Sequence, residues 1–283
     1  MDRLQIAIEK ARAQRALVRT AANETGRPVL VEPAPMPVAP TPDKDDLWRK
    51  LAPFDLSARS LHDTRLMARE GGRAAAPFDL LRTRVWHQAR QNGWRYIGIV
   101  SPTPDCGKTT AAANLAFSFS RQPDLRLMLL DLDLRRPSLA RMLGQQVEQG
   151  MQEILRGEFG FADHALRLGE NVAIGLNNKP AEAPSELLQS ARTEECIAGL
   201  TEQYDPDLVL FDLPPMLCTD DNFGFLSKVD AVLLMVAAEE TTHAQTELCL
   251  RQLKELTTVM GLVLNKCRHS GGLYGYSNDH AAA

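Results

Sequence analysis

The sequence predicts an α/β domain with a mostly parallel sheet flanked by helices. Short, continuously apolar runs alternate with segments of helical character from residue 94 onward. Strands that are apolar throughout are buried on both faces, as in parallel sheets covered by crossover helices. The expected strands are YIGIV (96–100), RLMLLDLD (126–133), NVAIGL (171–176), DLVLFDL (207–213), AVLLMVAA (231–238) and GLVLN (261–265). Ligands of such sheets bind at the carboxyl ends of the strands, so the residues that follow these runs are the candidates for a site.

The chain divides by composition into five parts. Residues 1–20 carry five basic and two acidic side chains, with apolar residues at helical spacing. This pattern predicts an amphipathic helix that is either a frayed surface helix or a docking helix. Proline recurs through 21–46, as is typical of an extended linker. The remaining parts are expected to be a loosely structured lead-in (47–76), the α/β domain (77–267, with helices at 77–92, from Gly107 and around 245–256) and a flexible tail (268–283).

The composition indicates a globular protein of the cytoplasm. Of the 283 residues, 44% are apolar and 24% are charged, and the net charge of −4 disfavours a nucleic-acid partner. No apolar run reaches the roughly 20 residues of a membrane-spanning helix, and the N-terminus lacks the apolar core of a signal peptide. The five cysteines are scattered without a C-x-x-C pair, which argues against a disulfide framework or a zinc site and predicts that most are buried.

A phosphate-binding loop follows the first strong strand. The segment SPTPDCGKTT (101–110) contains Gly107-Lys108-Thr109 and opens a predicted helix, where backbone N–H groups and the helix dipole favour phosphate. The general pattern of such loops has glycine where this chain has Pro102. Lys108 would neutralise the β- and γ-phosphates of a nucleotide, and the Thr109 hydroxyl would meet Mg²⁺.

Three aspartates follow later strands of the predicted sheet. Asp131 and Asp133 close the run LMLLDLDLRRP, and Asp212 closes LVLFDLPP. An aspartate at a strand end is commonly a helix cap, which is the alternative for any one of them. Three carboxylates at the same sheet edge as Lys108 instead predict one metal–phosphate centre, the arrangement that phosphoryl transfer requires.

At these segments the sequence resembles the bacterial tyrosine kinases, the CpsD/CapB-like kinases of capsule and exopolysaccharide synthesis within the MinD/ParA-like P-loop ATPases. SPTPDCGKTTAAANLA, LLDLDLRRPSL and VLFDLPP match the family's Walker A, Walker A′ and Walker B motifs, and the resemblance runs from about Phe78 to Tyr276. It implies a P-loop NTPase fold and an ATP-dependent protein-tyrosine autokinase that regulates exopolysaccharide or capsule polymerisation or export. ATP and Mg²⁺ would be its cofactors.

The resemblance also implies roles for the charged residues, position by position. Asp131 would be the base that accepts the proton of the tyrosine hydroxyl. Thr109, Asp133 and Asp212 would hold Mg²⁺ and its waters. The expected catalytic residues are therefore Lys108, Asp131, Asp133 and Asp212.

Further positions correspond to the family's nucleotide contacts. Arg135 and Arg136 would lie near the phosphates or a subunit boundary. Asn265, at the end of a late strand, resembles the position that contacts adenine, although an asparagine there is as often a turn residue. The expected nucleotide-binding residues are Pro104, Asp105, Cys106, Gly107, Lys108, Thr109, Thr110, Arg135 and Asn265.

The phosphate loop departs from the family at Asp105. Pro102 is ordinary by the family's pattern, but Asp105 stands where the family mostly has glycine. It adds a Cβ at a tight loop position and a negative charge near phosphates, and is expected to weaken nucleotide affinity. Cys106 beside it is either a thiol of depressed pKa near a helix N-terminus or a neutral spacer.

The tail has fewer tyrosines than is usual in the family, and the subunit motif matches at fewer positions. Tyr274 and Tyr276 are the candidate phosphoacceptors, where the family has a larger cluster of tyrosines; the alternative is a tail with incidental tyrosines. The family's E-x-x-R-x-x-R subunit motif would fall on Ala76, Asp79 and Arg82, of which only Arg82 matches. The case for self-association is correspondingly weak.

The N-terminal IEKARAQR segment and the proline-rich linker are similar to cytoplasmic autokinases of exopolysaccharide systems. This implies a separate membrane adaptor of the chain-length-determinant type as partner, which would recruit the chain to the inner face of the cell membrane. Two alternatives remain open. One is a MinD/ParA-like ATPase switch that dimerises with ATP and binds a membrane partner without phosphorylating protein. The other is a regulatory scaffold that binds nucleotide weakly or not at all because of Asp105.

Overall fold

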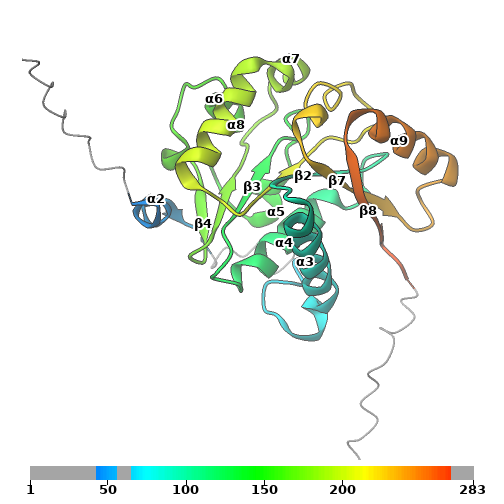
Figure 1. Ribbon diagram of the computed structural model, residues 1–283, viewed down its shortest axis with the longest axis horizontal. Coiled ribbons are helices and arrows are strands. Elements are labelled where there is room, and N and C mark those ends of the chain that lie inside the picture. The colour runs from blue at the N-terminus through cyan, green and yellow to red at the C-terminus, as the bar shows by residue number, and fades with distance from the viewer. Residues whose placement is uncertain (1–42, 56–64, 269–283) are drawn as a thin grey trace, which may run out of the picture. The chain divides into compact units, whose positions relative to one another are not determined.

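The computed structural model describes residues 43–55 and 65–268, which contain one eight-stranded sheet (Figure 1). The strand order is β1-β4-β5-β3-β6-β2-β7-β8; β4 and β5 are antiparallel, and every other neighbouring pair is parallel. The strands are β1 (Ala52–Pro53), β2 (Tyr96–Val100), β3 (Leu127–Asp131), β4 (Leu166–Leu168), β5 (Val172–Gly175), β6 (Leu208–Asp212), β7 (Ala231–Ala237) and β8 (Thr258–Asn265). The predicted α/β fold with a mostly parallel sheet is confirmed.

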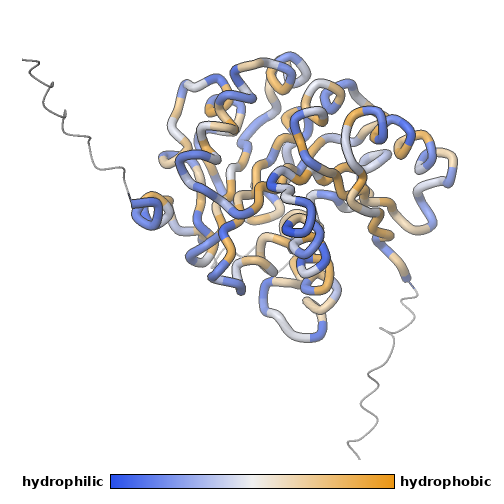
Figure 2. The backbone as a smooth tube through the Cα atoms, viewed as in Figure 1, coloured by the Kyte–Doolittle hydropathy of each residue, from blue (hydrophilic) through white to orange (hydrophobic). Residues whose placement is uncertain are grey.

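Helices cover both faces of this sheet. They are α2 (Lys44–Lys50), α3 (Gly72–Asn92), α4 (Lys108–Ser120), α5 (Leu139–Leu143), α6 (Met151–Leu155), α7 (Pro184–Gln189), α8 (Ala191–Tyr204) and α9 (His243–Leu256). Within β3, Leu127 and Leu129 pack in the core beneath α3, α4 and α5, whereas Met128 and Leu130 pack in the core beneath α6, α8 and α9. Because successive side chains of a strand point to opposite faces, an apolar strand needs both layers. Figure 2 accordingly shows the hydrophobic residues concentrated along the strands.

The structure differs from the expected loose lead-in at its two ends. Helix α2 begins within the expected linker, because the Asp43 side chain accepts a hydrogen bond from the Asp45 N–H and caps the helix. Strand β1 is two residues long and pairs with β4, too short to give a periodic signal. Helix α3 begins at Gly72, before the expected start at Pro77, which lies inside the helix. Proline at position 77 predicts a helix start, but the packing of Ala75 into the core extends the helix on its N-terminal side.

Residues 43–55 are attached to the α/β core through Trp48. Its side chain is buried, and its indole N–H donates to the carbonyl of Tyr204 at 2.8 Å. The Tyr204 ring meets it edge-on, and the Arg126 guanidinium lies 5.5 Å from its ring centroid. Further along, Phe54 packs edge-on against Phe117 of α4. The segment 43–55 therefore contacts α4, the helix that follows the phosphate loop.

We expect Trp48→Phe to lower the free energy of unfolding by about 1 to 3 kcal/mol, because the buried Tyr204 carbonyl loses its donor and Arg126 loses the larger ring. Urea unfolding followed by circular dichroism measures the change. The half-buried Trp94 gives a matched control, and Trp94→Phe is expected to cost less. Equal losses in the two variants would contradict a specific role for the Trp48 hydrogen bond.

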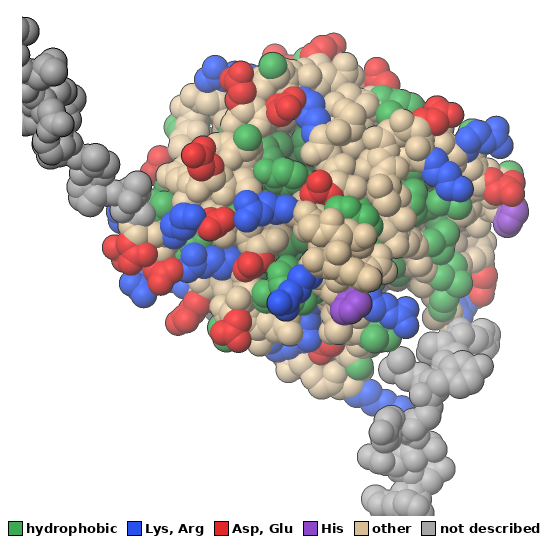
Figure 3. Space-filling model, in the orientation of Figure 1, with side chains coloured by type: hydrophobic (Ala, Val, Ile, Leu, Met, Phe, Trp, Pro, Cys, Tyr) green, Lys and Arg blue, Asp and Glu red, His purple; other side chains and the backbone are tan. Residues whose placement is uncertain are grey.

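Several sequence expectations fall outside the described residues. These are the amphipathic helix over 1–20, the linker up to residue 42, and Tyr274 and Tyr276. Within the described ranges, no helix combines the length and apolar character that crossing a membrane requires. On the face shown in Figure 3, Lys and Arg side chains lie interspersed with Asp and Glu.

Candidate active site

The aspartates and the phosphate loop meet at one edge of the sheet. Strands β3, β6 and β2 are neighbours, and all three run parallel. Asp131 of β3 lies opposite Asp212 of β6, and Asp212 lies opposite Ile99 of β2. The loop 101–107 leaves β2 at this point and leads into α4. The convergence that the strand-end pattern predicted is therefore present.

Backbone geometry at Gly107 and Asp105 shapes the loop. Gly107 has a φ of 87°, and a Cβ there would collide with the side-chain amide of Asn265. Glycine is thus required at this position for two independent reasons. Asp105 also lies in the left-handed region, with a φ of 61°, and its side chain is exposed. Aspartate tolerates this conformation better than most residues, but glycine would adopt it without strain.

Lys108 is the buried cation of the site. Its Nζ lies 2.7 Å from Asp133 Oδ2, and both side chains are about nine-tenths buried. Burial alone lowers the pKa of Lys108, but the carboxylates of Asp212, Asp133 and Asp131 outweigh it and raise the pKa above the usual value. The lysine therefore carries its charge and is held among three acidic groups.

Asp131 and Asp212 lie fully buried beneath this ion pair. Burial, together with the neighbouring Asp212 and Asp133, raises the pKa of Asp131 well above its ordinary value. Burial raises the pKa of Asp212 to about 6, although Lys108 and the nearby Thr109 hydroxyl, which does not reach hydrogen-bond geometry, oppose the shift. Both Asp212 oxygens and one Asp131 oxygen have no hydrogen-bond partner among the described residues. Buried polar atoms without partners are costly, so these oxygens fit a site that binds a metal ion or its waters.

Arg135 points from the loop after β3 and is fixed by an ion pair. Its Nε and one terminal nitrogen donate to the two oxygens of Asp221 at 2.9 and 2.8 Å. Asp221 is buried and also accepts a hydrogen bond from the Ser185 hydroxyl. Two parallel bonds to a buried carboxylate define the direction of the guanidinium plane. By contrast, the Arg136 side chain is exposed. Its backbone N–H donates a hydrogen bond to Asp133 Oδ1 at 3.1 Å.

Asn265 and Cys106 are tied to each other at the end of β8. The Asn265 side-chain amide donates to the Cys106 carbonyl at 2.9 Å. Burial raises the pKa of the Cys106 thiol, but hydrogen bonds from Thr103 and Thr241 and from backbone amides together leave it below its usual value. The direction agrees with the low-pKa interpretation, yet the side chain is buried. The expectation that most cysteines are buried is wrong, because Cys106 and Cys249 are the only two of the five that are.

A cavity of about 1200 Å³ opens above the phosphate loop and the ion pair. Of the expected site residues, those that line it are Pro104, Asp105, Gly107, Lys108, Thr109, Thr110, Asp133, Arg135, Arg136 and Asn265. Cys106, Asp131 and Asp212 do not. The lining residues that sequence reasoning missed include Arg65, Met67, Phe78, Ser138, Arg141 and Met142. Residues 65–68 reach the cavity through tertiary contacts to α4, which no local pattern reveals.

The donor set suits a nucleotide with Mg²⁺ better than a metal held by protein alone. Within 43–55 and 65–268, no three or more His, Cys, Asp or Glu side chains are arranged to hold a metal ion. Mg²⁺ commonly uses one or two carboxylates, a hydroxyl, waters and substrate phosphates. Thr109 on the cavity wall and the unpartnered carboxylate of Asp212 below it match that requirement.

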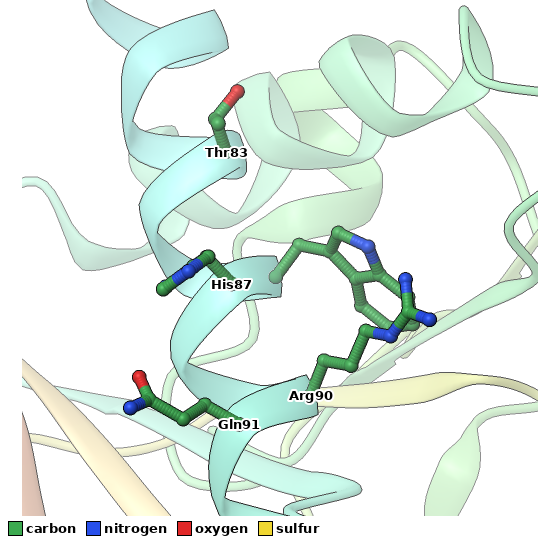
Figure 4. Close-up of a pocket in the computed structure, with 5 residues that line it drawn as sticks. Thr83, His87, Arg90 and Gln91 are labelled. Atoms are coloured by element: carbon green, nitrogen blue, oxygen red, sulfur yellow. The ribbon is translucent and has the colours of Figure 1, made fainter.

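The helix that would carry the family's subunit motif is engaged within this chain. Asp79 forms ion pairs with Arg121 and Arg82, and Arg82 also donates to the Ser118 carbonyl at 2.8 Å. The Arg82 side chain is only 14% exposed. A smaller hollow of about 550 Å³ lies further along α3, beside Thr83, His87, Arg90 and Gln91 (Figure 4). No residue of the phosphate loop lines it, so the nucleotide candidate is the larger cavity.

Known proteins match this chain over its α/β core. The profile of the CobQ/CobB/MinD/ParA nucleotide binding domain matches residues 97–274. The tyrosine-protein kinase Wzc of Salmonella typhimurium is 31% identical over 194 residues, which cover 67% of this chain and 26% of that protein. The tyrosine-protein kinase CpsD of Streptococcus pneumoniae is 28% identical over 187 residues, 64% of this chain and 80% of that protein. This chain spans 24–26% of the length of the first curated relatives it matches.

Solved structures agree with the sequence comparisons. The kinase domain of the Escherichia coli tyrosine kinase ETK is 26% identical with a TM-score of 0.62, covering 72% of this chain and 80% of that one. MinD of Pyrococcus horikoshii, solved with Mg-ADP, shares the fold at 23% identity and a TM-score of 0.50, covering 60% and 69%. The chain belongs to the CobQ/CobB/MinD/ParA nucleotide-binding family, within the branch of the bacterial tyrosine kinases.

Proposed function

We propose that the protein is an ATP-dependent protein-tyrosine autokinase that regulates the polymerisation or export of an exopolysaccharide or capsule. The observation that carries the proposal is the buried Lys108–Asp133 pair above the unpartnered Asp212 carboxylate, at the mouth of a phosphate loop. Support also comes from relatives whose names describe tyrosine-protein kinases. A membrane adaptor of the chain-length-determinant type is the proposed partner, with the inner face of the cell membrane as the place of action.

In the proposed reaction, a tyrosine oxygen bonds to the γ-phosphorus of ATP. The bond from that phosphorus to the β,γ-bridging oxygen breaks, and ADP leaves with the electron pair. Lys108 would exchange Asp133 for phosphate oxygens, and the backbone of 104–110 would cradle the phosphates. Bound Mg²⁺, held through Thr109 and Asp212, would supply neutralisation of the phosphate charge.

We propose Asp133, in place of Asp131, as the residue that accepts the proton of the tyrosine hydroxyl. Asp131, the base that the family resemblance implies, has no surface on the cavity, and burial together with the neighbouring Asp212 and Asp133 raises the pKa of its carboxyl. Asp133 lines the cavity and is released when Lys108 turns to phosphate. We therefore assign the phenolic proton to Asp133. Asp131 would act as a positioning residue, since its Oδ1 accepts the Asp133 N–H at 3.2 Å.

Incubation with Mg-ATP and mass spectrometry of the tail tests the proposal. Phosphate is expected on Tyr274, Tyr276 or both, increased by the membrane adaptor, and absent from the double variant Tyr274→Phe/Tyr276→Phe. ATP consumption without phosphate on either tyrosine, with and without the adaptor, would refute the kinase.

A nucleotide-controlled dimerisation switch is the second candidate. It is favoured by Arg82, which is engaged with Asp79 and Ser118 of its own chain instead of being presented to a neighbour. The switch predicts dimerisation with ATP in light scattering, lost in Lys108→Met and unchanged when both tail tyrosines are replaced by phenylalanine. The kinase predicts that those same tyrosine replacements abolish the covalent product.

We expect Asp105→Gly to tighten Mg-ATP binding about fivefold, because it removes both a left-handed Cβ and a negative charge at the cavity. Isothermal titration calorimetry gives the affinity. Asp105→Asn separates the two causes, since asparagine removes the charge but keeps the Cβ in a conformation it tolerates. No detectable binding in the wild type together with binding in Asp105→Gly would instead support the regulatory scaffold.

A further inference from the structure

The cavity above the phosphate loop is larger than one small ligand requires. Its volume is about 1200 Å³, whereas sites for a single small ligand span roughly 300–1,000 Å³. The phosphate loop, Asn265 and Lys266 line one part. The other part is lined from three separate elements, by Arg65 and Met67 before α3, Phe78 of α3, and Arg141 and Met142 of α5.

The segment that carries Arg65 and Met67 is held firmly against α4. The Asn114 side chain donates to the Arg65 carbonyl at 3.0 Å and accepts the Ala68 N–H at 2.8 Å. Leu66 and Ala68 are buried in the core, so the alternate side chains of Arg65 and Met67 line the cavity. Asn114 also donates to the Thr110 carbonyl at 2.8 Å, which links this wall to the first turn after the phosphate loop.

The cations of the cavity fall into two groups. Lys108, Arg135 and Lys266 each have a carboxylate partner, respectively Asp133, Asp221 and Glu240. Arg65, Arg136 and Arg141 line the same cavity, and none of the three forms an ion pair with a described residue. Guanidinium groups without internal partners are available to carboxylates of a ligand, which they bind in planar, bidentate geometry.

The surface between these arginines is apolar. Met67, Phe78 and Met142 contribute large side chains to the cavity, and Met67 is 54% exposed. Thioether and aromatic groups pack well against an aromatic ring. A ring with anionic neighbours therefore matches this wall in both polarity and charge.

We propose that Arg65, Met67, Phe78, Arg136, Arg141 and Met142 form an acceptor subsite for a tyrosine that is flanked by acidic residues in a partner protein. The proposal deepens the kinase function above and rests on it for the reaction, but not for binding. The methionines and Phe78 would hold the ring, and the arginines would hold carboxylates on either side of it.

The chain's own tail matches this subsite poorly. Residues 269–283 contain one acidic side chain, Asp279, and the tyrosines at 274 and 276 have glycine, leucine and serine as direct neighbours. Charge complementarity therefore favours an acidic segment of another protein over the tail. The subsite would then direct phosphoryl transfer to a substrate other than the kinase itself.

Fluorescence anisotropy tests binding with a labelled peptide that has glutamates on both sides of one tyrosine, in the presence of Mg-ADP. We expect Arg65→Ala and Arg141→Ala each to weaken binding about 5- to 20-fold. Arg84→Ala is the matched control, an exposed arginine of α3 outside the cavity, and should change binding less than twofold. A peptide with lysines in place of the glutamates should bind at least tenfold more weakly to the wild type.

The ring contact is tested separately. Replacing the peptide's tyrosine by alanine should weaken binding to the wild type, and this difference should shrink in Met67→Ala. The proposal is overturned if Arg65→Ala weakens Mg-ATP binding in calorimetry and leaves peptide binding unchanged, or if acidic and basic peptides bind alike. Binding of the acidic peptide without its phosphorylation would uphold the subsite and count against the kinase function instead.

Discussion

Lys108→Met is expected to reduce phosphoryl transfer by about a thousandfold or more. Lys108 is the cation at the centre of three carboxylates and lies at the start of α4, where phosphates would meet the helix N-terminus. Removing a preorganised charge that faces the transferring group commonly costs factors of 10² to 10³, and here the uncompensated carboxylates would also repel the nucleotide. Tail phosphorylation with Mg-ATP, followed over time by mass spectrometry, measures the loss.

A lysine–carboxylate pair elsewhere in the fold provides the control. Lys228 lies 3.3 Å from Glu194 and donates to the Ser190 carbonyl, away from the cavity. Lys228→Met should leave the rate within about threefold of the wild type, because a partly exposed pair contributes little. Thermal unfolding of both variants shows whether each is folded. A folded Lys108→Met variant with more than a tenth of the wild-type rate would contradict the assigned role.

The convergence of the site could be predicted from the sequence because it depends on a simple rule. Asp131 and Asp212 each end an apolar run, and parallel strands place their carboxyl ends at one sheet edge. The position of Lys108 follows in the same way from the loop after β2. Apolar runs and the residues that end them are local features of the sequence. They predict strand positions reliably where the sheet is buried on both faces.

The second wall of the cavity could not be predicted, because it depends on contacts between distant segments. Asn114 fixes residues 65–68 against α4 through two hydrogen bonds that span more than forty positions of sequence. Likewise, the atom that a Cβ at Gly107 would meet belongs to Asn265, which is close in space but lies near the end of the domain's sequence. The sequence indicated that Asp105 was unusual there, but its left-handed backbone became evident only in the structure.

Asp212→Asn should raise stability and lower activity at the same time. The Asp212 carboxyl is buried, its pKa is raised from 3.8 to about 6, and its oxygens have no hydrogen-bond partner among the described residues. At neutral pH this carboxylate is charged although burial disfavours the charged form, which lowers the stability of the folded protein. Asparagine removes that penalty, so we expect about 1 to 3 kcal/mol of added stability without ligand near pH 7.5. Loss of the carboxylate should reduce phosphoryl transfer by about 10²-fold or more.

The pH dependence gives this prediction its sign. A carboxyl whose pKa is raised on folding stabilises the folded state most when protonated, and that stability is lost as pH rises from 3.8 to about 6. The advantage of Asp212→Asn over the wild type should therefore grow through that window and stay constant above it. Urea unfolding at a series of pH values measures the difference.

Asp205→Asn is the control with the opposite sign. Hydrogen bonds from Lys44 and Arg95 hold the pKa of Asp205 below its usual value, so its stabilising effect is present at neutral pH and lost in acid. Asp205 has a φ of 46°, which asparagine also tolerates, so its replacement tests charge and not backbone strain. Asp205→Asn should lower stability at pH 7.5 while Asp212→Asn raises it. Equal destabilisation by both substitutions would mean that the Asp212 carboxylate stabilises the fold. It would contradict the view that this buried charge lowers stability and is kept for phosphoryl transfer.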